Sequence, residues 1–137
     1  MKIIGTVERS RTNYYSIYPN KDILDCAPFG YGFSVKEAEQ DFKDGIEELK
    51  EMKREELGYV PKEFDNLVIE FRYDISTMFA VFDFLNVSRF AKLAGINESK
   101  MRQYACGAAK PGVRNTKRIS VALKELGETL VDASDRK

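Results

Sequence analysis

A long amphipathic helix between residues 35 and 57 is the feature that most constrains how this chain can fold. Ser34 and Glu37 fit a capping box, in which the Ser34 hydroxyl accepts from the Glu37 amide and the Glu37 carboxylate reaches back to the Ser34 amide. Gly58 is expected to end the helix. A helix with one apolar side needs a second layer to cover that side. The apolar residues, which recur at steps of three and four, are Val35, Ala38, Phe42, Ile46, Leu49 and Met52.

Strand-like segments on both sides of this helix supply the second layer. They are rich in β-branched and aromatic residues and are separated by turn-forming residues. In the last of them, Leu67, Ile69 and Phe71 alternate with residues that point to the opposite face. We therefore expect residues 1–73 to form a small βββαβ domain of the α+β class. The expected strands are Lys2–Arg9, Tyr14–Tyr18, part of Ile23–Phe33, and Asn66–Tyr73.

Aromatic residues are frequent in the second and third of these segments. The pair Tyr14-Tyr15, Phe29 and Tyr31 are candidates for a partner-binding surface, since aromatic side chains are enriched at interfaces. Packing of the same residues in the core of the domain is the alternative interpretation.

The charges are divided between the two halves of the chain. Residues 1–85 hold 11 basic and 17 acidic residues, a net charge of −6, whereas residues 86–137 hold 11 basic and 5 acidic residues, a net charge of +6. Within residues 86–118, Glu98 is the only acidic residue against eight basic ones. A polyanion such as DNA would be attracted to this stretch and repelled by the first half.

The second half has helical periodicity, and we expect an all-α domain over residues 74–137. Ser88 is a candidate N-cap for the second helix and Asn97 for the third, which Gly107 closes. An amphipathic helix with Gly127 as a point of interruption completes an expected five-helix arrangement. The predicted helical segments are Ser76–Leu85, Arg89–Ala94, Glu98–Ala105, and residues 115 to about 131.

The segment Phe90–Tyr104 has the pattern of two helices joined by a short turn. Gly95 allows a positive φ in that turn, Ile96 fills the angle between the helices, and the small Ala91 and Ala94 keep that angle tight. The segment resembles the phage-repressor-type (XRE/Cro-type) helix-turn-helix, and the resemblance covers about residues 76–131. It implies that the second helix of the pair enters the major groove of operator DNA.

The position of each polar residue in this pattern suggests its contact with DNA. Arg102 could pair with guanine and Gln103 with adenine. Phosphate contacts would fix the register without reading the sequence. The candidates for base edges are Glu98, Ser99, Arg102 and Gln103, and the candidates for phosphates are Lys100, Lys110, Arg114, Asn115 and Arg118.

The segment Gly32–Ala38 (GFSVKEA) opens the acidic helix after short strands, and it resembles the glycine–hydroxyl–Glu-Ala signature of HicB-family antitoxins. Where HicB proteins usually have Pro-Gly-Cys, this chain has Asp25–Gly30 (DCAPFG). The resemblance covers the architecture of the whole chain. It implies a degenerate RNase H-like N-terminal domain joined to a DNA-binding C-terminal domain.

This resemblance implies an antitoxin of a type II toxin–antitoxin system. The N-terminal domain would bind and block a HicA-like toxin, a small basic mRNA interferase, and an acidic first half suits a basic partner. The C-terminal domains would pair as a homodimer or a higher homo-oligomer and repress the operon of the chain itself. The alternative is a stand-alone helix-turn-helix repressor whose N-terminal domain senses a ligand or only oligomerises.

Other classes of function find less support in the sequence. There is no histidine, and Cys26 and Cys106 have no metal-ligand spacing, so we expect buried reduced thiols, no metal and no cofactor. The commonest general base is therefore missing, and we expect no enzymatic activity. A two-metal nuclease is the minor alternative, although no spacing gathers the acidic residues Glu8, Asp22, Asp25 and Glu70.

The hydropathy of the sequence also predicts the cellular compartment of the protein. No uncharged apolar run reaches the roughly 18 residues that a membrane span needs. Charged residues lie too close to the start of the chain for the apolar core of a secretory signal. We therefore expect a cytoplasmic protein.

Overall fold

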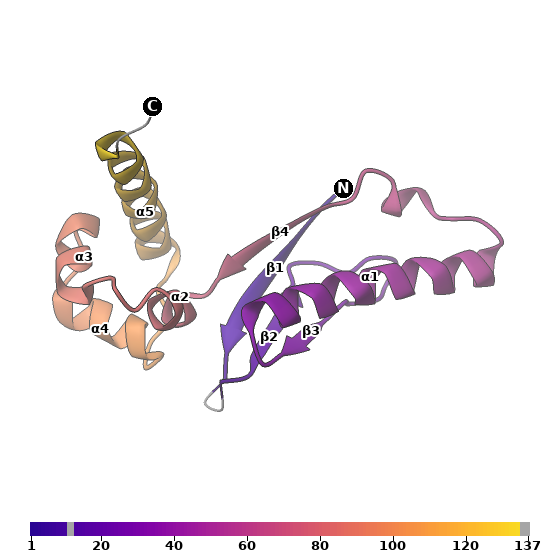
Figure 1. The fold of residues 1–137 in the computed structure, drawn as a ribbon, viewed down its shortest axis with the longest axis horizontal. Coiled ribbons are helices and arrows are strands. Elements are labelled where there is room, and N and C mark those ends of the chain that lie inside the picture. The colour runs from indigo at the N-terminus through magenta and orange to yellow at the C-terminus, as the bar shows by residue number, and fades with distance from the viewer. Residues whose placement is uncertain (11–12, 135–137) are drawn as a thin grey trace. The chain divides into compact units, whose positions relative to one another are not determined.

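The structure, a computed structural model, describes residues 1–10 and 13–134. The chain is of the α+β class, as predicted, and divides into two compact units, Met1–Thr77 and a second unit that begins at Met78. Figure 1 follows the elements from one end to the other. They are β1 (Lys2–Arg9), β2 (Tyr15–Pro19), β3 (Gly30–Gly32), α1 (Val35–Leu57), a 3-10 turn η1 (Lys62–Phe64), β4 (Val68–Tyr73), α2 (Ile75–Val81), α3 (Val87–Ala94), α4 (Glu98–Cys106) and α5 (Val113–Ala133).

The first unit contains a four-stranded mixed sheet in the order β3-β2-β1-β4. β1 pairs antiparallel with β2, with Val7 opposite Ile17, and β2 pairs antiparallel with β3. β4 is parallel to β1, with Ile3 opposite Ile69. A parallel neighbour requires a crossover connection, and α1 provides it. The predicted order of three strands, one helix and a fourth strand is therefore confirmed.

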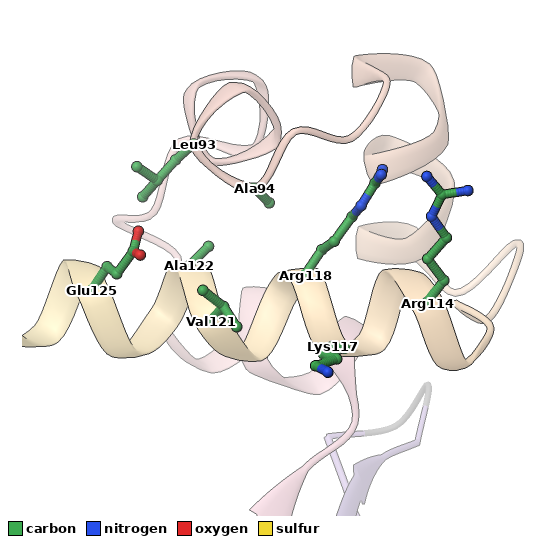
Figure 2. A pocket seen from close by; sticks show the side chains of 8 residues that line it. All are labelled: Leu93, Ala94, Arg114, Lys117, Arg118, Val121, Ala122 and Glu125. Carbon is green, nitrogen blue, oxygen red and sulfur yellow. The ribbon is translucent and has the colours of Figure 1, made fainter.

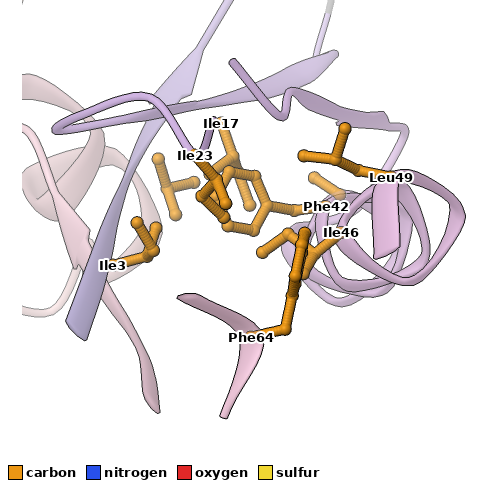
Figure 3. Packing of buried hydrophobic residues seen from close by; sticks show 9 residues of the cluster. Ile3, Ile17, Ile23, Phe42, Ile46, Leu49 and Phe64 are labelled. Carbon is orange, nitrogen blue, oxygen red and sulfur yellow. The ribbon is translucent and has the colours of Figure 1, made fainter. Parts of the chain in front are cut away.

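Helix α1 covers one face of this sheet and forms the core with it. Figure 3 shows the Phe42 side chain directed from α1 toward Ile17 and Ile23, and all three are buried. The start and end of α1 are as predicted. Met52 is the exception in the predicted apolar stripe, because its side chain is 50% exposed. The helix has 23 residues and spans about 34 Å, more than the roughly 27 Å of β1, so its last turns extend beyond the strand.

Two glycines let β3 lie directly against the backbone of α1. A Cβ atom at Gly30 would collide with the Ala38 carbonyl oxygen and lie 2.7 Å from the Phe42 Cβ. A Cβ atom at Gly32 would lie 2.7 Å from the Ala38 amide nitrogen. Ala38 itself is fully buried. The small residues of the Gly32–Ala38 segment are thus explained by the close approach of strand and helix.

The second unit is helical and has its own apolar core. Phe79 and Phe90 pack edge to face with their ring centroids 5.7 Å apart, and Met101 of α4 and Ile119 of α5 are buried. The predicted five-helix arrangement is wrong, because described residues 74–134 form four α-helices. Helix α5 continues through Gly127, since one glycine among good helix formers costs only about 1 kcal/mol.

None of the helices in the described part of the chain combines the length and the apolar character that crossing a membrane requires.

Candidate nucleic-acid interface and partner surface

A three-residue turn joins α3 to α4 and fixes the angle between them. Gly95 adopts the left-handed conformation, with φ at 70°, as the sequence predicts. The Ile96 amide then donates to the Ala91 carbonyl oxygen over 2.9 Å, and the Ile96 side chain is buried. The predicted positive φ of Gly95 is therefore confirmed, and Ile96 is buried, as its predicted place between the two helices requires.

Helix α3 begins two residues earlier than predicted. Its N-cap is Asn86, whose side-chain oxygen accepts from the Arg89 amide over 2.9 Å, so the prediction that Ser88 caps this helix is wrong. Both residue types are good N-caps, and the sequence alone did not separate them. Ser88 instead lies in the first turn of α3, where its hydroxyl is free to contact α4.

Helix α4 has one buried and one exposed side. Asn97 caps it as predicted, accepting from the Lys100 amide over 3.2 Å, and Gly107 ends it with φ at 81°. Met101 and Tyr104 are buried against the rest of the bundle. The candidates for base contacts lie at the N-terminal end or on the exposed side of this helix. Ser99, Lys100, Arg102 and Gln103 are exposed, and Glu98 is half-buried.

Ser88, Glu98 and Arg102 form a hydrogen-bonded cluster that the sequence did not predict. The Ser88 hydroxyl donates to Glu98 Oε1 over 2.6 Å, and the Arg102 guanidinium pairs with the same oxygen. Arg102 Nη2 also lies 3.3 Å from Ser88 Oγ. The Ser88 hydrogen bond and the Arg102 charge hold the pKa of the Glu98 carboxyl below its ordinary value. Glu98 therefore remains charged and keeps Arg102 close to the surface of α4.

Two of the candidates for phosphate contacts are engaged within the second unit. The Asn115 side-chain amide donates to the Tyr104 hydroxyl over 2.9 Å and joins α5 to α4. Arg118 Nη1 donates to the Gly95 carbonyl oxygen over 3.2 Å and supports the turn. Both side chains are half-buried. The structure thus gives these two residues a positioning role that sequence reasoning missed, because each bond joins segments distant in sequence.

Arg114 and Lys110 are exposed. Arg114 lines a groove between α3 and α5 with Lys117 and Arg118 (Figure 2). The floor of this groove is apolar, and Leu93 and Ala94 of α3 lie across from Ala122 of α5. The groove joins cationic and apolar groups on one side of the second unit.

The first unit exposes aromatic side chains around its edge strand β3. Tyr14 stacks with Tyr31 at a centroid distance of 6.2 Å and meets Phe33 edge to face at 5.0 Å. Phe33 is 76% exposed, and Tyr31 and Phe29 are each 48% exposed. We call Tyr14, Phe29, Tyr31 and Phe33 the aromatic edge. Phe33 was not among the predicted surface residues, and Tyr15 packs against the core instead.

Two carboxylates of α1 accept hydrogen bonds from backbone amides at the outer edge of the sheet, in β3 and just after it. The Tyr31 amide donates to Asp41 Oδ2 and the Phe33 amide to Glu37 Oε2, each over 2.8 Å. Ser34 accepts from the Glu37 amide as predicted, but Glu37 reaches the Phe33 amide rather than the predicted Ser34 amide. An edge strand with occupied donors cannot readily accept a further strand, so the aromatic edge offers its side chains rather than its backbone.

Two of the four acidic residues weighed for a nuclease have other partners. Glu70 pairs with Lys2 over 3.0 Å, and Glu8 accepts from the Tyr18 hydroxyl over 3.5 Å. No group of three potential metal ligands was found in the part of the chain that the structure describes. The expectation of two buried thiols is wrong: Cys26 is half-buried and Cys106 is exposed. Cys106 ends α4 on the same side as the exposed Gln103 and contacts the Gln103 carbonyl oxygen.

Comparison with known proteins gives no match to any protein-family model, curated protein or solved structure.

Proposed function

We propose that this protein is a DNA-binding transcriptional regulator in which α3, the Gly95–Asn97 turn and α4 act as a helix-turn-helix. The observation that carries the proposal is the exposed polar side of α4, which lies opposite the buried Met101 and Tyr104. A helix held this way at a glycine turn has the form that major-groove recognition requires. The net charge of +6 over residues 86–137 suits a polyanion.

Within this proposal, the side chains of α4 divide into two roles. Ser99, Arg102 and Gln103 face base edges, and Lys100 faces a phosphate. Arg102 must leave Glu98, or carry Glu98 with it, to reach a guanine. Two copies of the chain would place two α4 helices in successive major grooves, about 34 Å apart on one side of the DNA.

We further propose that the chain is the antitoxin of a toxin–antitoxin pair and that the first unit is a degenerate RNase H-like domain of HicB type. The aromatic edge supports a protein partner, because exposed aromatic side chains are enriched at interfaces. The acidic first half supports a basic partner, such as a HicA-like mRNA interferase. A stand-alone repressor with a ligand-sensing or oligomerising first unit is the second candidate, and it keeps every argument for DNA binding.

Co-expression with the protein encoded next to this chain tests the proposal. We expect the two proteins to co-purify, growth inhibition by the neighbour to be relieved, and Phe33→Ala with Tyr31→Ala to weaken the complex. Lys21→Ala is the matched control on an exposed part of the same unit. DNA binding without a complex or a toxic neighbour would favour the stand-alone repressor. A chain that binds neither DNA nor its neighbour would contradict both candidates.

A further inference from the structure

Helix α5 has opposite charges in its two halves. Residues 113–123 hold three basic residues and no acidic one, whereas residues 124–133 hold one basic and three acidic residues. The acidic residues are Glu125, Glu128 and Asp132, and the basic residues of the first half are Arg114, Lys117 and Arg118. This order is unfavourable for the helix dipole, which favours acidic groups at the N-terminus and basic groups at the C-terminus. The stability of α5 by itself therefore does not explain why its basic residues precede its acidic ones.

Most of these charges lie on one narrow side of α5. Six residues follow one another at alternating steps of four and three, so their side chains share one side of the helix. We call them the α5 stripe. It consists of Arg114, Arg118, Val121, Glu125, Glu128 and Asp132. Lys117 flanks its basic end. Figure 2 shows the first half of the stripe beside the groove between α3 and α5.

Exposed apolar side chains accompany the stripe. Leu93 and Val121 border the groove and are each about half exposed. Leu130 and Val131 lie in the last turns of α5, where every described residue from Gly127 onward is exposed. An isolated helix end of this length is marginal in water, so helix packing on a partner would stabilise it. A shallow hollow at Gly127, bordered by Glu128 and Val131, leaves room for a side chain of that partner.

We propose that the α5 helices of two copies of this chain pair in antiparallel orientation through the α5 stripe. Reversal of the stripe about residue 123 places Arg114 opposite Asp132 of the second copy and Arg118 opposite Glu128. The same twofold arrangement repeats each pair, as a symmetric dimer requires. Apolar contacts of Val121, Leu93 and Val131 supply the attraction, and the charges select the antiparallel orientation.

The self-complementary charges identify the occupant of this surface as a second copy. A basic or acidic partner of another kind would match one half of the stripe and repel the other. A parallel pair would set like charges side by side. The pairing leaves the exposed side of α4 free, but it gives Arg114 and Arg118 a protein partner in place of the phosphates expected from the sequence. It extends the dimer of the proposed function, yet it requires neither DNA nor toxin.

Two charge-reversed variants of the full chain test the pairing. The first carries Arg114→Glu and the second carries Asp132→Lys, the two positions that face each other across the pairing. Each variant alone meets like charges across the twofold axis, so we expect its homodimer to be weakened about tenfold or more. When the two variants are mixed, every facing pair is again of opposite sign. We therefore expect a heterodimer of nearly the original affinity.

Sedimentation equilibrium at low salt measures the self-association, and the two variants with tags of different mass reveal the heterodimer. Circular dichroism checks that each variant keeps its helix content. The control, Lys21→Glu with Lys62→Glu, reverses two exposed charges in the first unit and should leave self-association unchanged. Recovery upon mixing supports the pairing. A monomeric unaltered chain, undiminished homodimers of both variants, or no recovery upon mixing would each overturn it, whatever the outcome for DNA or toxin binding.

Discussion

At the scale of single residues, the cluster of Ser88, Glu98 and Arg102 bears most directly on the DNA contacts that we propose for α4. Glu98 is the only acidic residue among the basic residues of segment 86–118, and the structure places it against Arg102. A free arginine would bind any phosphate within reach. An arginine that is paired with a carboxylate binds DNA only where the free energy of its contact with a base edge exceeds the free energy lost when the ion pair breaks. We infer that Glu98 suppresses non-specific binding and thereby favours a specific site.

Glu98→Gln should therefore raise the affinity for random-sequence DNA by about threefold to tenfold, because α4 loses a negative charge and Arg102 loses its partner. Fluorescence anisotropy with a labelled random duplex measures this change. Lowering the pH to a mildly acidic value cannot reproduce the effect of Glu98→Gln. The lowered pKa of Glu98 keeps the carboxylate charged as the pH falls toward its ordinary value of 4.5, and the pair is lost only below it.

Asp83→Asn is the matched control for Glu98→Gln, because it removes one exposed negative charge near the start of α3. It should change the affinity for random DNA much less. If Glu98→Gln abolished binding to a specific site and left random DNA unaffected, Glu98 would itself contact a base, and the inferred suppression would be wrong.

The glycines of β3 permit a second prediction at this scale. Gly30→Ala places a Cβ atom against the Ala38 carbonyl oxygen and the Phe42 Cβ, and we expect a loss of about 1–3 kcal/mol in the free energy of unfolding. Urea denaturation measures the loss. Gly45→Ala is the control, because its Cβ would meet only the Phe29 carbonyl oxygen, at 3.6 Å. That change lies within α1 and should stabilise the chain by about 0.5–1 kcal/mol. Equal effects of the two substitutions would contradict the close packing.

At the scale of the elements, α1 covers the sheet and also closes its edge. Its apolar side packs on β1 and β2. Asp41 accepts from an outer amide of β3, and Glu37 accepts from the amide of the residue that follows the strand. The strand has only three residues and would otherwise expose these donors beside the aromatic edge. Unpaired edge strands promote association between copies. The same helix therefore keeps an apolar surface available for a partner without inviting strand addition.

Asp41→Ala should leave the Tyr31 amide without its acceptor and destabilise the first unit by about 1–2 kcal/mol. We also expect more self-association at high concentration, measured by light scattering, because the edge of β3 is opened. Glu47→Ala removes an exposed acidic residue from the same helix and is the control. If both variants behaved alike, the Asp41 contact would have no role in closing the edge.

Local signals explain how much of the fold could be predicted from the sequence. Helix α1 was predicted at both ends because Ser34 and Gly58 are strong terminal signals, and β1 was predicted by its β-branched residues. The start of α3 was missed because Asn86 and Ser88 compete as caps, and only the packed structure selects one. Met52 follows the apolar periodicity of α1, but α1 is longer than β1 and its last turns extend beyond that strand. Cys106 was expected to be buried because free cysteines usually are, and the sequence does not show that its side chain is exposed in the structure.

The candidate site was predicted less completely than the fold. The polar residues of α4 could be read from helical periodicity, since Met101 and Tyr104 had to face inward. The contacts that restrain these residues could not be predicted from helical periodicity. Arg118 reaches the Gly95 carbonyl oxygen across 23 positions, and Ser88 reaches Glu98 across 10. Such contacts depend on the angle between helices, which packing sets and sequence spacing does not reveal.

At the scale of the whole molecule, the division of charge suits the different partners that we propose for the two halves of the chain. The first half carries −6 and the aromatic edge, and the second carries +6 and the exposed side of α4. A neutral average keeps the chain as a whole from binding polyanions indiscriminately. The DNA binding that we propose must then depend on local cations of the second unit rather than on the total charge.

Salt dependence separates these local cations from the rest of the chain. The logarithm of the DNA affinity falls linearly with the logarithm of salt concentration, with a slope of about 0.9 for each phosphate neutralised. Lys100→Ala should reduce that slope by about one for each copy that binds and weaken all DNA sequences to a similar degree, because Lys100 is exposed near the N-terminus of α4. Lys62→Ala removes an exposed lysine of the first unit and should leave the slope unchanged. Binding isotherms of the unaltered chain and both variants, over a range of salt concentrations, provide the measurement. If Lys62→Ala lowered the slope as much as Lys100→Ala, DNA would respond to the charge of the whole chain, and the assignment of binding to α4 would fail.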